Sequence, residues 1–205
     1  RKAEYRDDPF GDGPPFAAFS SYAKKEAIEQ SQVPMFVWVS WFDAATVCGA
    51  LSRFNTYSNP MRVVIGPWSH QGRFDANPFN SANAALDLTK EKRDQQSIQF
   101  FSAHLKDADA KEARQISYYT MGENKWKTTD VWPPKGVELR AWYLSPNNAL
   151  SPSAPADADA SDTYKVDFTA TTGERNRWRT QAQGEDVVYA DRAEQDKKLL
   201  TYTSP

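Results

Sequence analysis

Two ionisable side chains follow short apolar runs in the sequence. Asp43 comes shortly after residues 33–39 (VPMFVWV), and His70 comes shortly after residues 61–65 (MRVVI). A carboxylate in contact with an imidazole forms a general-base pair, in which the carboxylate orients the ring and the ring takes up a proton. The chemistry that these residue types offer is therefore proton transfer to and from a nucleophile.

The two apolar runs are the elements that must position this pair. Each is short, continuous and rich in β-branched or aromatic residues, which is typical of strands buried on both faces of a parallel sheet. Ligands in open α/β sheets bind beyond the carboxyl ends of the strands. We therefore expect Asp43 and His70 to meet there, like the Asp and His of a Ser-Asp-His triad in an α/β-hydrolase.

A plainer interpretation of both residues stays open at this point. Asp is common at helix starts, so Asp43 could cap a helix expected over residues 44–57. A single His after a strand is usually a surface or packing residue. Position in the sequence alone does not separate these alternatives.

Several motifs in order give the chain a specific resemblance. Residues 41–43 (WFD) and 66–70 (GPWSH) resemble the Asp and His regions of the CocE/NonD hydrolases. That family groups cocaine-esterase-like enzymes, α-amino acid ester hydrolases and S15-type Xaa-Pro dipeptidyl-peptidases. Further similar segments are 100–101 (FF) with 105–106 (LK), 121–126 (MGENKW), 132–134 (WPP), 176–178 (NRW) and 199–204 (LLTYTS). Ser40 departs from the family pattern, which has Gly there, and puts the geometry of this turn in question.

The resemblance implies roles for particular residues. Asp43 and His70 would be catalytic, and Trp41 and Trp68 would pack around the two turns or line the substrate pocket. The substrate would be a small ester, amide or peptide, and no cofactor is needed. Esterase and dipeptidyl-peptidase activities both stay open, as does a homo-oligomer of the complete enzyme.

The nucleophile of such a triad is not found in this sequence. No serine lies in a G-x-S-x-G-like elbow, and Ser69 is a poor candidate because it adjoins His70. Since the order in α/β-hydrolases is Ser, Asp, His, we expect the serine to precede this chain. We therefore expect an internal piece of a larger enzyme that is inactive by itself, with nothing to indicate its cellular location.

The expected fold class is α/β plus all-β, in three segments. Residues 1–19 would be a loop leading from a cap region, and 20–113 the C-terminal part of an α/β-hydrolase domain. Residues 114–205 would be the first part of a jelly-roll β-sandwich. Expected helices are 20–31, 44–57 and 88–106, the last with an apolar stripe of Ile98, Phe101 and Leu105; expected later strands are 116–121, 138–144, 164–168, 186–189 and 199–203.

Composition excludes several other classes of protein. The net charge of −2 argues against nucleic-acid binding and against electrostatic membrane binding, and no apolar run is long enough to span a bilayer. The single cysteine, Cys48, excludes an intrachain disulfide, and no metal-binding motif is present. The competing function is a non-catalytic β-sandwich module that binds peptide or carbohydrate through residues 115–205.

Overall fold

The structure is a computed structural model of the chain, and it describes residues 5, 7–9, 11–70, 72–80, 84–106, 113–157, 159–176, 178–179 and 189–205. The described residues leave out most of the expected strand 186–189 and Arg177 of the NRW motif. They also leave out most of the polar stretch 107–114 (DADAKEAR), which the sequence indicates to be a linker. The elements are η1 Phe16–Phe19, η2 Ser21–Lys24, α1 Lys25–Ser31, β1 Met35–Ser40, α2 Thr46–Thr56, β2 Met61–Gly66, α3 Lys90–Lys106, β3 Gln115–Thr120, β4 Lys125–Thr129, β5 Tyr143–Ser145, β6 Ala149–Ser151 and α5 Ala193–Asp196.

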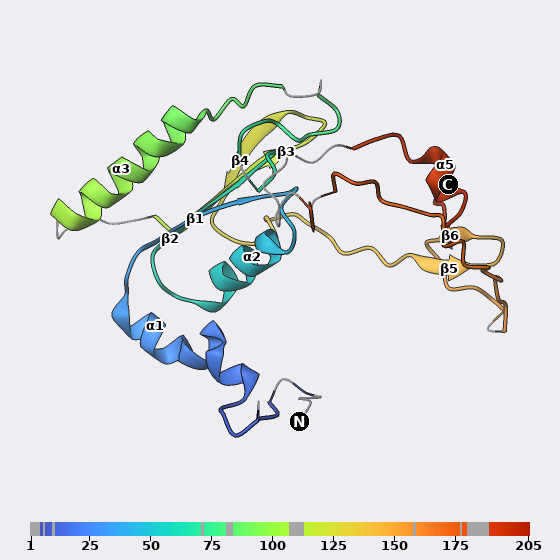
Figure 1. Cartoon of the computed structure of the whole chain (residues 1–205), viewed down its shortest axis with the longest axis horizontal. Helices are drawn as coiled ribbons and strands as arrows, with labels where there is room; N and C mark the ends of the chain where they lie inside the picture. The colour runs from blue at the N-terminus through green and yellow to red at the C-terminus, as the bar shows by residue number, and fades with distance from the viewer. Residues whose placement is uncertain are drawn as a thin grey trace.

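Strands β1 and β2 pair in parallel, joined by the helix α2 (Figure 1). Their register runs from Met35 opposite Met61 to Ser40 opposite Gly66, so the two strands end side by side. The expected strands 33–39 and 61–65 agree with β1 and β2 to within two residues. This pairing brings the turns that carry Asp43 and His70 to one edge of the sheet.

Alternating side chains of β1 and β2 enter two cores, one on each face of the sheet. The first core contains Val39, Met61, Val63 and Ile65 packed against residues of α2, and Ile65 is fully buried. The second core contains Val64, with Phe36 and Trp38 packed against it, on the opposite face. Both faces are therefore apolar, which is why the strand sequences are continuous apolar runs instead of alternating ones.

The helices α2 and α3 lie on opposite sides of the sheet (Figure 1). Ala50 and Phe54, one helical turn apart, bury one face of α2 in the first core. On α3, Phe100 is buried and its ring centroid lies 5.3 Å from that of Phe36 on β1. Phe100 thus anchors α3 over the second core.

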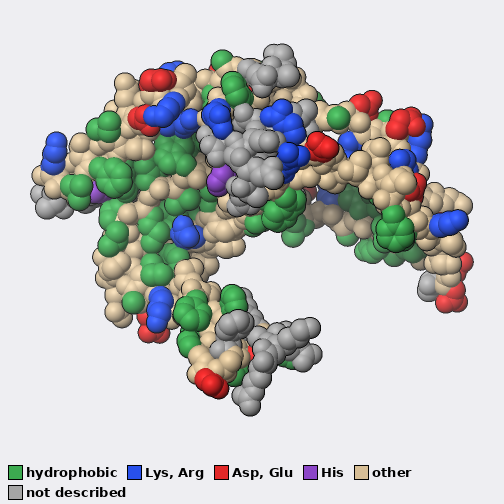
Figure 2. All heavy atoms as spheres, in the orientation of Figure 1, with side chains coloured by type: hydrophobic (Ala, Val, Ile, Leu, Met, Phe, Trp, Pro, Cys, Tyr) green, Lys and Arg blue, Asp and Glu red, His purple; other side chains and the backbone are tan. Residues whose placement is uncertain are grey.

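The expected apolar stripe of α3 does not face the sheet. Ile98, Phe101 and Leu105 are 64%, 58% and 80% exposed, and hydrophobic side chains are visible along this part of the surface (Figure 2). Residues at spacings of three and four share a helix face, and Phe100 belongs to a different face from this stripe. The sequence period correctly predicts the helix, whereas tertiary contacts select the side that packs.

Strand β3 extends the same sheet and does not begin a separate one. It pairs in parallel with β2, and β4 then pairs with β3 in an antiparallel hairpin, so the order is β1-β2-β3-β4. The expected domain boundary between residues 113 and 114 therefore does not coincide with a boundary between sheets. The β3–β4 turn, with Gly122 and Asn124 at positive φ, lies beyond the carboxyl end of β3.

The C-terminal part of the chain contains less regular structure than we expected. Strands β5 and β6 form a hairpin, and Thr203 bridges to Ala149 beside it. Residues 164–168 form no strand, and 138–144 contribute only the first two residues of β5. A strand requires a partner backbone for its hydrogen bonds, and the described residues supply none there. None of the described helices has the length and apolar character needed to cross a bilayer.

The buried core residues and the exposed apolar stripe of α3 should respond differently to truncation of a side chain. Ile65→Ala should lower the free energy of unfolding by about 2–5 kcal/mol, because it leaves a cavity in a fully buried core. Leu105→Ala, which removes the same kind of side chain from the exposed stripe, should change it by less than about 0.5 kcal/mol. Urea denaturation of both variants measures the difference, and an equal cost for both would contradict the packing described for α3.

Candidate active site

The turn that follows β1 holds Asp43 by backbone hydrogen bonds. The N–H of Trp41 donates to the Gly66 carbonyl at 3.1 Å, which continues the parallel ladder one residue beyond the strands. The N–H of Asp43 donates to the Ser40 carbonyl at 3.3 Å, and the N–H of Phe42 donates to Ser40 Oγ at 3.0 Å. Ser40, which is buried, thus contributes a side-chain acceptor where the CocE/NonD pattern has Gly.

The carboxylate of Asp43 does not cap the following helix. The N-cap of α2 is Ala45, in the left-handed region at φ 64°, and no side chain caps this helix end. Only the main-chain carbonyl of Asp43 contacts the first helical residue, Thr46. The capping interpretation of Asp43 is therefore not what the structure contains, and its carboxylate is directed elsewhere.

Asp43 and His70 form a hydrogen bond. Nδ1 of His70 lies 3.0 Å from Oδ2 of Asp43. The side chain of Asp43 is 9% exposed and that of His70 is 40% exposed, so the ring reaches solvent while the carboxylate stays inside. A neutral imidazole that donates from Nδ1 keeps a lone pair on Nε2, and that nitrogen makes no hydrogen bond within the described ranges. The pair has the arrangement of a general base with a free proton-accepting nitrogen.

The second oxygen of Asp43 is also informative. Oδ1 is buried and accepts no hydrogen bond from the residues that the structure describes. A buried carboxylate oxygen is normally satisfied, because leaving it without a donor costs free energy. Buried polar atoms without a partner, which lower stability, are common at functional sites, where polar groups serve chemistry.

The loop that carries His70 begins under a buried indole. Trp68 is 5% exposed, and its ring centroid lies 6.2 Å from that of Trp38 and 6.1 Å from that of Trp126. A Cβ at Gly66 would lie 1.9 Å from an atom of the Trp68 ring. Glycine is therefore required at position 66, because the indole packs directly over its Cα.

A network of short polar side chains holds the rest of this loop against the β3–β4 turn. Asp75 accepts hydrogen bonds from the Asn77 N–H at 2.8 Å and from the side-chain amide of Asn80 at 2.6 Å. The amide of Asn77 donates to Asn124 at 3.0 Å, and the amide of Asn124 donates to Asn80 at 3.2 Å. Burial, and secondarily the charge of Asp75, raises the pKa of Tyr119 beside this network.

The two tryptophans expected near the substrate make structural contacts. Trp41 donates its indole N–H to the Tyr119 carbonyl at 2.8 Å and packs against Trp132, while Trp68 lies in the second core. These contacts tie both turns to the sheet. A direct role of Trp41 or Trp68 in substrate binding stays a prediction.

Sequence reasoning missed two sets of residues around the pair. Asn77 and Asn80 lie in the stretch 71–87, which the sequence predicts to be irregular and where amide side chains carry little signal. Asn124 belongs to the MGENKW segment, whose resemblance implied no role for it. Tyr189, whose ring centroid lies 5.3 Å from that of Phe42, comes from the far end of the chain, and no local pattern predicts that contact. Among the described residues, no cluster of three His, Cys, Asp or Glu side chains could hold a metal ion.

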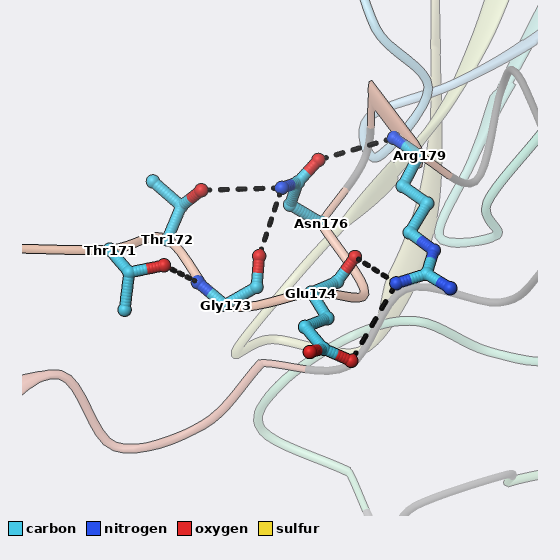
Figure 3. Close-up of polar contacts among 6 residues, drawn as sticks. All are labelled: Thr171, Thr172, Gly173, Glu174, Asn176 and Arg179. Carbon is cyan, nitrogen blue, oxygen red and sulfur yellow. Dashed lines mark hydrogen bonds and ion pairs between the residues drawn. The ribbon is translucent and has the colours of Figure 1, made fainter.

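The NRW motif has a structural role at the residues that can be described. The Asn176 side chain accepts a hydrogen bond from the N–H of Arg179 and donates to Thr172 and Gly173 (Figure 3). It also accepts a hydrogen bond from the N–H of Trp178. Arg179 pairs with Glu174 at 3.7 Å in the same turn. Asn176 thus organises a turn, and its hydrogen bonds leave its amide engaged with its own segment.

Comparison with known proteins provides a second line of information. No model of a known protein family matches the chain. Two curated proteins, from Mycobacterium bovis and Mycobacterium tuberculosis, are each named "Putative serine esterase" and are 38% identical to it over 181 residues. The alignment covers 86% of this chain but 28% of each relative, so the chain spans less than a third of their length. The chain is therefore similar to serine-esterase-like proteins.

The contact between Gly66 and Trp68 predicts a strong and local glycine effect. Gly66→Ala should lower the free energy of unfolding by about 3 kcal/mol, because the new methyl group overlaps the indole. Gly49→Ala is the matched control: its Cβ would meet nothing within 4 Å in α2, and it should raise stability by about 0.5–1 kcal/mol. Urea titration tests both, and a Gly66→Ala variant as stable as the parent would contradict the packing described here.

Proposed function

We propose that this chain contributes Asp43 and His70 of a Ser-Asp-His triad to a serine hydrolase of the CocE/NonD type. The observation that carries the proposal is the 3.0 Å contact between His70 Nδ1 and Asp43 Oδ2 beyond the ends of two adjacent parallel strands. The similarity to proteins named as serine esterases supports the same class of reaction. The attacking serine lies outside this chain.

The reaction is acyl transfer through a covalent intermediate. The serine hydroxyl attacks the carbonyl carbon of the substrate, and its proton moves to Nε2 of His70. His70 then gives this proton to the leaving alkoxide or amine as the carbon–heteroatom bond breaks. A water molecule attacks the acyl-enzyme in the same way, with its proton passing through His70 to the departing serine oxygen.

Asp43 has two tasks in this reaction. Its hydrogen bond to Nδ1 fixes the tautomer in which Nε2 is the proton acceptor, and its charge stabilises the imidazolium that forms. Burial of the carboxylate beside a half-exposed ring suits both tasks, since the low local dielectric strengthens the interaction. The chemistry requires no metal or cofactor.

The proposed architecture is the C-terminal part of an α/β-hydrolase domain followed by part of a jelly roll. The parallel β1-β2-β3 order and the helices on both faces support the first part. The β5–β6 hairpin, with Thr203 bridged beside it, supports a β-structured second part. Since β3 and β4 belong to the first sheet, the transition between the two parts would follow β4.

The substrate class is proposed from chemistry and from the relatives. Both relatives are named as esterases, which favours an ester over an Xaa-Pro peptide. Binding of peptide or carbohydrate by a non-catalytic module remains the second candidate. It is favoured by Trp142 and Trp178, which are 47% and 61% exposed in the C-terminal part.

The triad proposal predicts the effect of histidine substitutions in the longer polypeptide that carries the serine. His70→Ala should lower kcat on an activated ester by about 10⁴-fold or more, because triad members act as a unit. His104→Gln is the control, since His104 packs against Phe100 on α3 and should leave kcat unchanged. Turnover that survives His70→Ala would rule out the assignment.

A separate prediction concerns the 205-residue chain alone. Since the proposed nucleophile is absent from it, the chain should not react with a fluorophosphonate probe and should not hydrolyse an activated ester above the rate of a His70→Ala variant. Mass spectrometry detects probe attachment directly. Stoichiometric labelling of a serine in this chain, abolished by His70→Ala, would show that the nucleophile is internal.

A further inference from the structure

We propose that Arg93 on α3 is a positioning residue for His70, holding the turn that presents the imidazole to Asp43. The catalytic meaning of this inference rests on the proposed function. We call the two contacts of Arg93, with Trp68 and with Gly72, the Arg93 clamp. Its geometry does not depend on the proposed function, since it follows from contacts between α3 and the loop after β2.

Arg93 contacts the chain on both sides of His70. Its Nη2 donates a hydrogen bond to the Gly72 carbonyl at 2.6 Å. The guanidinium carbon also lies 5.2 Å from the ring centroid of Trp68, in a cation–π contact. Trp68 is two residues before His70 and Gly72 is two residues after it, so one side chain spans the segment that carries the ring.

A backbone hydrogen bond also joins the two sides of His70. The N–H of Gly72 donates to the Ser69 carbonyl at 3.0 Å. Gly72 adopts φ +62°, a conformation that glycine reaches without strain. Gly72 thus donates its N–H to Ser69 and accepts from Arg93 through its carbonyl, so Arg93 holds the peptide unit that follows Gly72.

The fit around Arg93 is close. A Cβ at Gly72 would lie 3.2 Å from Nη1 of Arg93, so the guanidinium packs directly against the backbone of the turn. Burial lowers the pKa of Arg93, and Nη1 is buried with no hydrogen-bond partner among the described residues. The guanidinium is therefore partly withdrawn from solvent where it lies against this turn.

Arginine is suited to this position in a way that lysine is not. Its planar fork can lie over an indole while an edge N–H donates in the plane of the guanidinium. A lysine ammonium is a compact charge that can replace one of the two contacts but lacks the planar surface for the other. The two contacts together predict that the shape of the side chain matters as well as its charge.

Other contacts also join the two sides of the His70 loop. Trp68 and Asp75 form an isolated bridge, and the Ala76 N–H donates to the Pro67 carbonyl at 2.6 Å. Arg93 adds contacts nearer to the ring, at Trp68 and Gly72. Without it, the imidazole would keep its place in the fold but lose the alignment of Nδ1 with the Asp43 carboxylate.

The test measures the His70–Asp43 hydrogen bond directly in the full 205-residue chain. With only two histidines in the sequence, ¹⁵N-histidine labelling gives two sets of ring signals, and His104→Gln assigns them. The parent chain should show a downfield Nδ1–H proton for His70 that Asp43→Asn removes. Arg93→Met and Arg93→Lys should both lose or broaden this proton, with the backbone amide spectrum otherwise retained.

Lys90→Met is the matched control on the same helix. Within the described part of the chain, Lys90 pairs with the exposed Asp94, so this variant should leave the proton unchanged. Retention of the signal in Arg93→Met would overturn the proposal, and retention in Arg93→Lys would overturn the role of the planar fork. Unfolding of both Arg93 variants, with Lys90→Met folded, would also overturn it, since Arg93 would then serve global stability.

Activity of the longer polypeptide separates this inference from the proposed function. If both hold, Arg93→Lys should lower kcat by about 10- to 100-fold with little change in KM, as expected for a misplaced catalytic group. If Arg93→Lys loses the Nδ1–H proton but keeps its kcat, the positioning role of Arg93 is supported and the catalytic role of His70 is refuted. If the Nδ1–H signal of His70 is unchanged in Arg93→Met, the positioning role of Arg93 is refuted at any level of activity.

Discussion

The parallel pairing of β1 with β2 is the constraint on which the rest of the structure depends. Its register ends with Ser40 opposite Gly66, so the chain leaves both strands at the same edge of the sheet. Three residues later in one case and four in the other, Asp43 and His70 are close enough for a 3.0 Å hydrogen bond. A slip of one residue would turn every core side chain of either strand to the opposite face, and it would separate this pair.

Tight packing around Trp68 then fixes the loop that carries His70. The indole of Trp68 lies over Gly66 so closely that no side chain fits there, and Arg93 lies over the same indole from α3. The close packing at Gly66 and the cation over the ring both favour one placement of this indole, which restricts the path of the loop that follows it. The imidazole is therefore placed by apolar packing and a cation, while the residues around it stay partly open to solvent.

Residues far along the chain from Asp43 and His70 also support the site. Strands β3 and β4 widen the sheet, and their turn binds the His70 loop through Asn124. Tyr189 packs against Phe42, the residue before Asp43. Substitutions far along the chain can thus reach the Asp43–His70 pair through the contacts that support both turns.

By itself, the sequence determined the local elements and the candidate pair. Apolar runs predicted β1 and β2, helical periodicity predicted α2 and α3, and strand ends pointed to Asp43 and His70, because neighbouring residues encode all of these. Only the tertiary structure decided which face of α3 packs, that β3 joins the first sheet, and that Arg93 reaches Gly72. Those outcomes depend on contacts between residues far apart in the chain, whose energies no local pattern records.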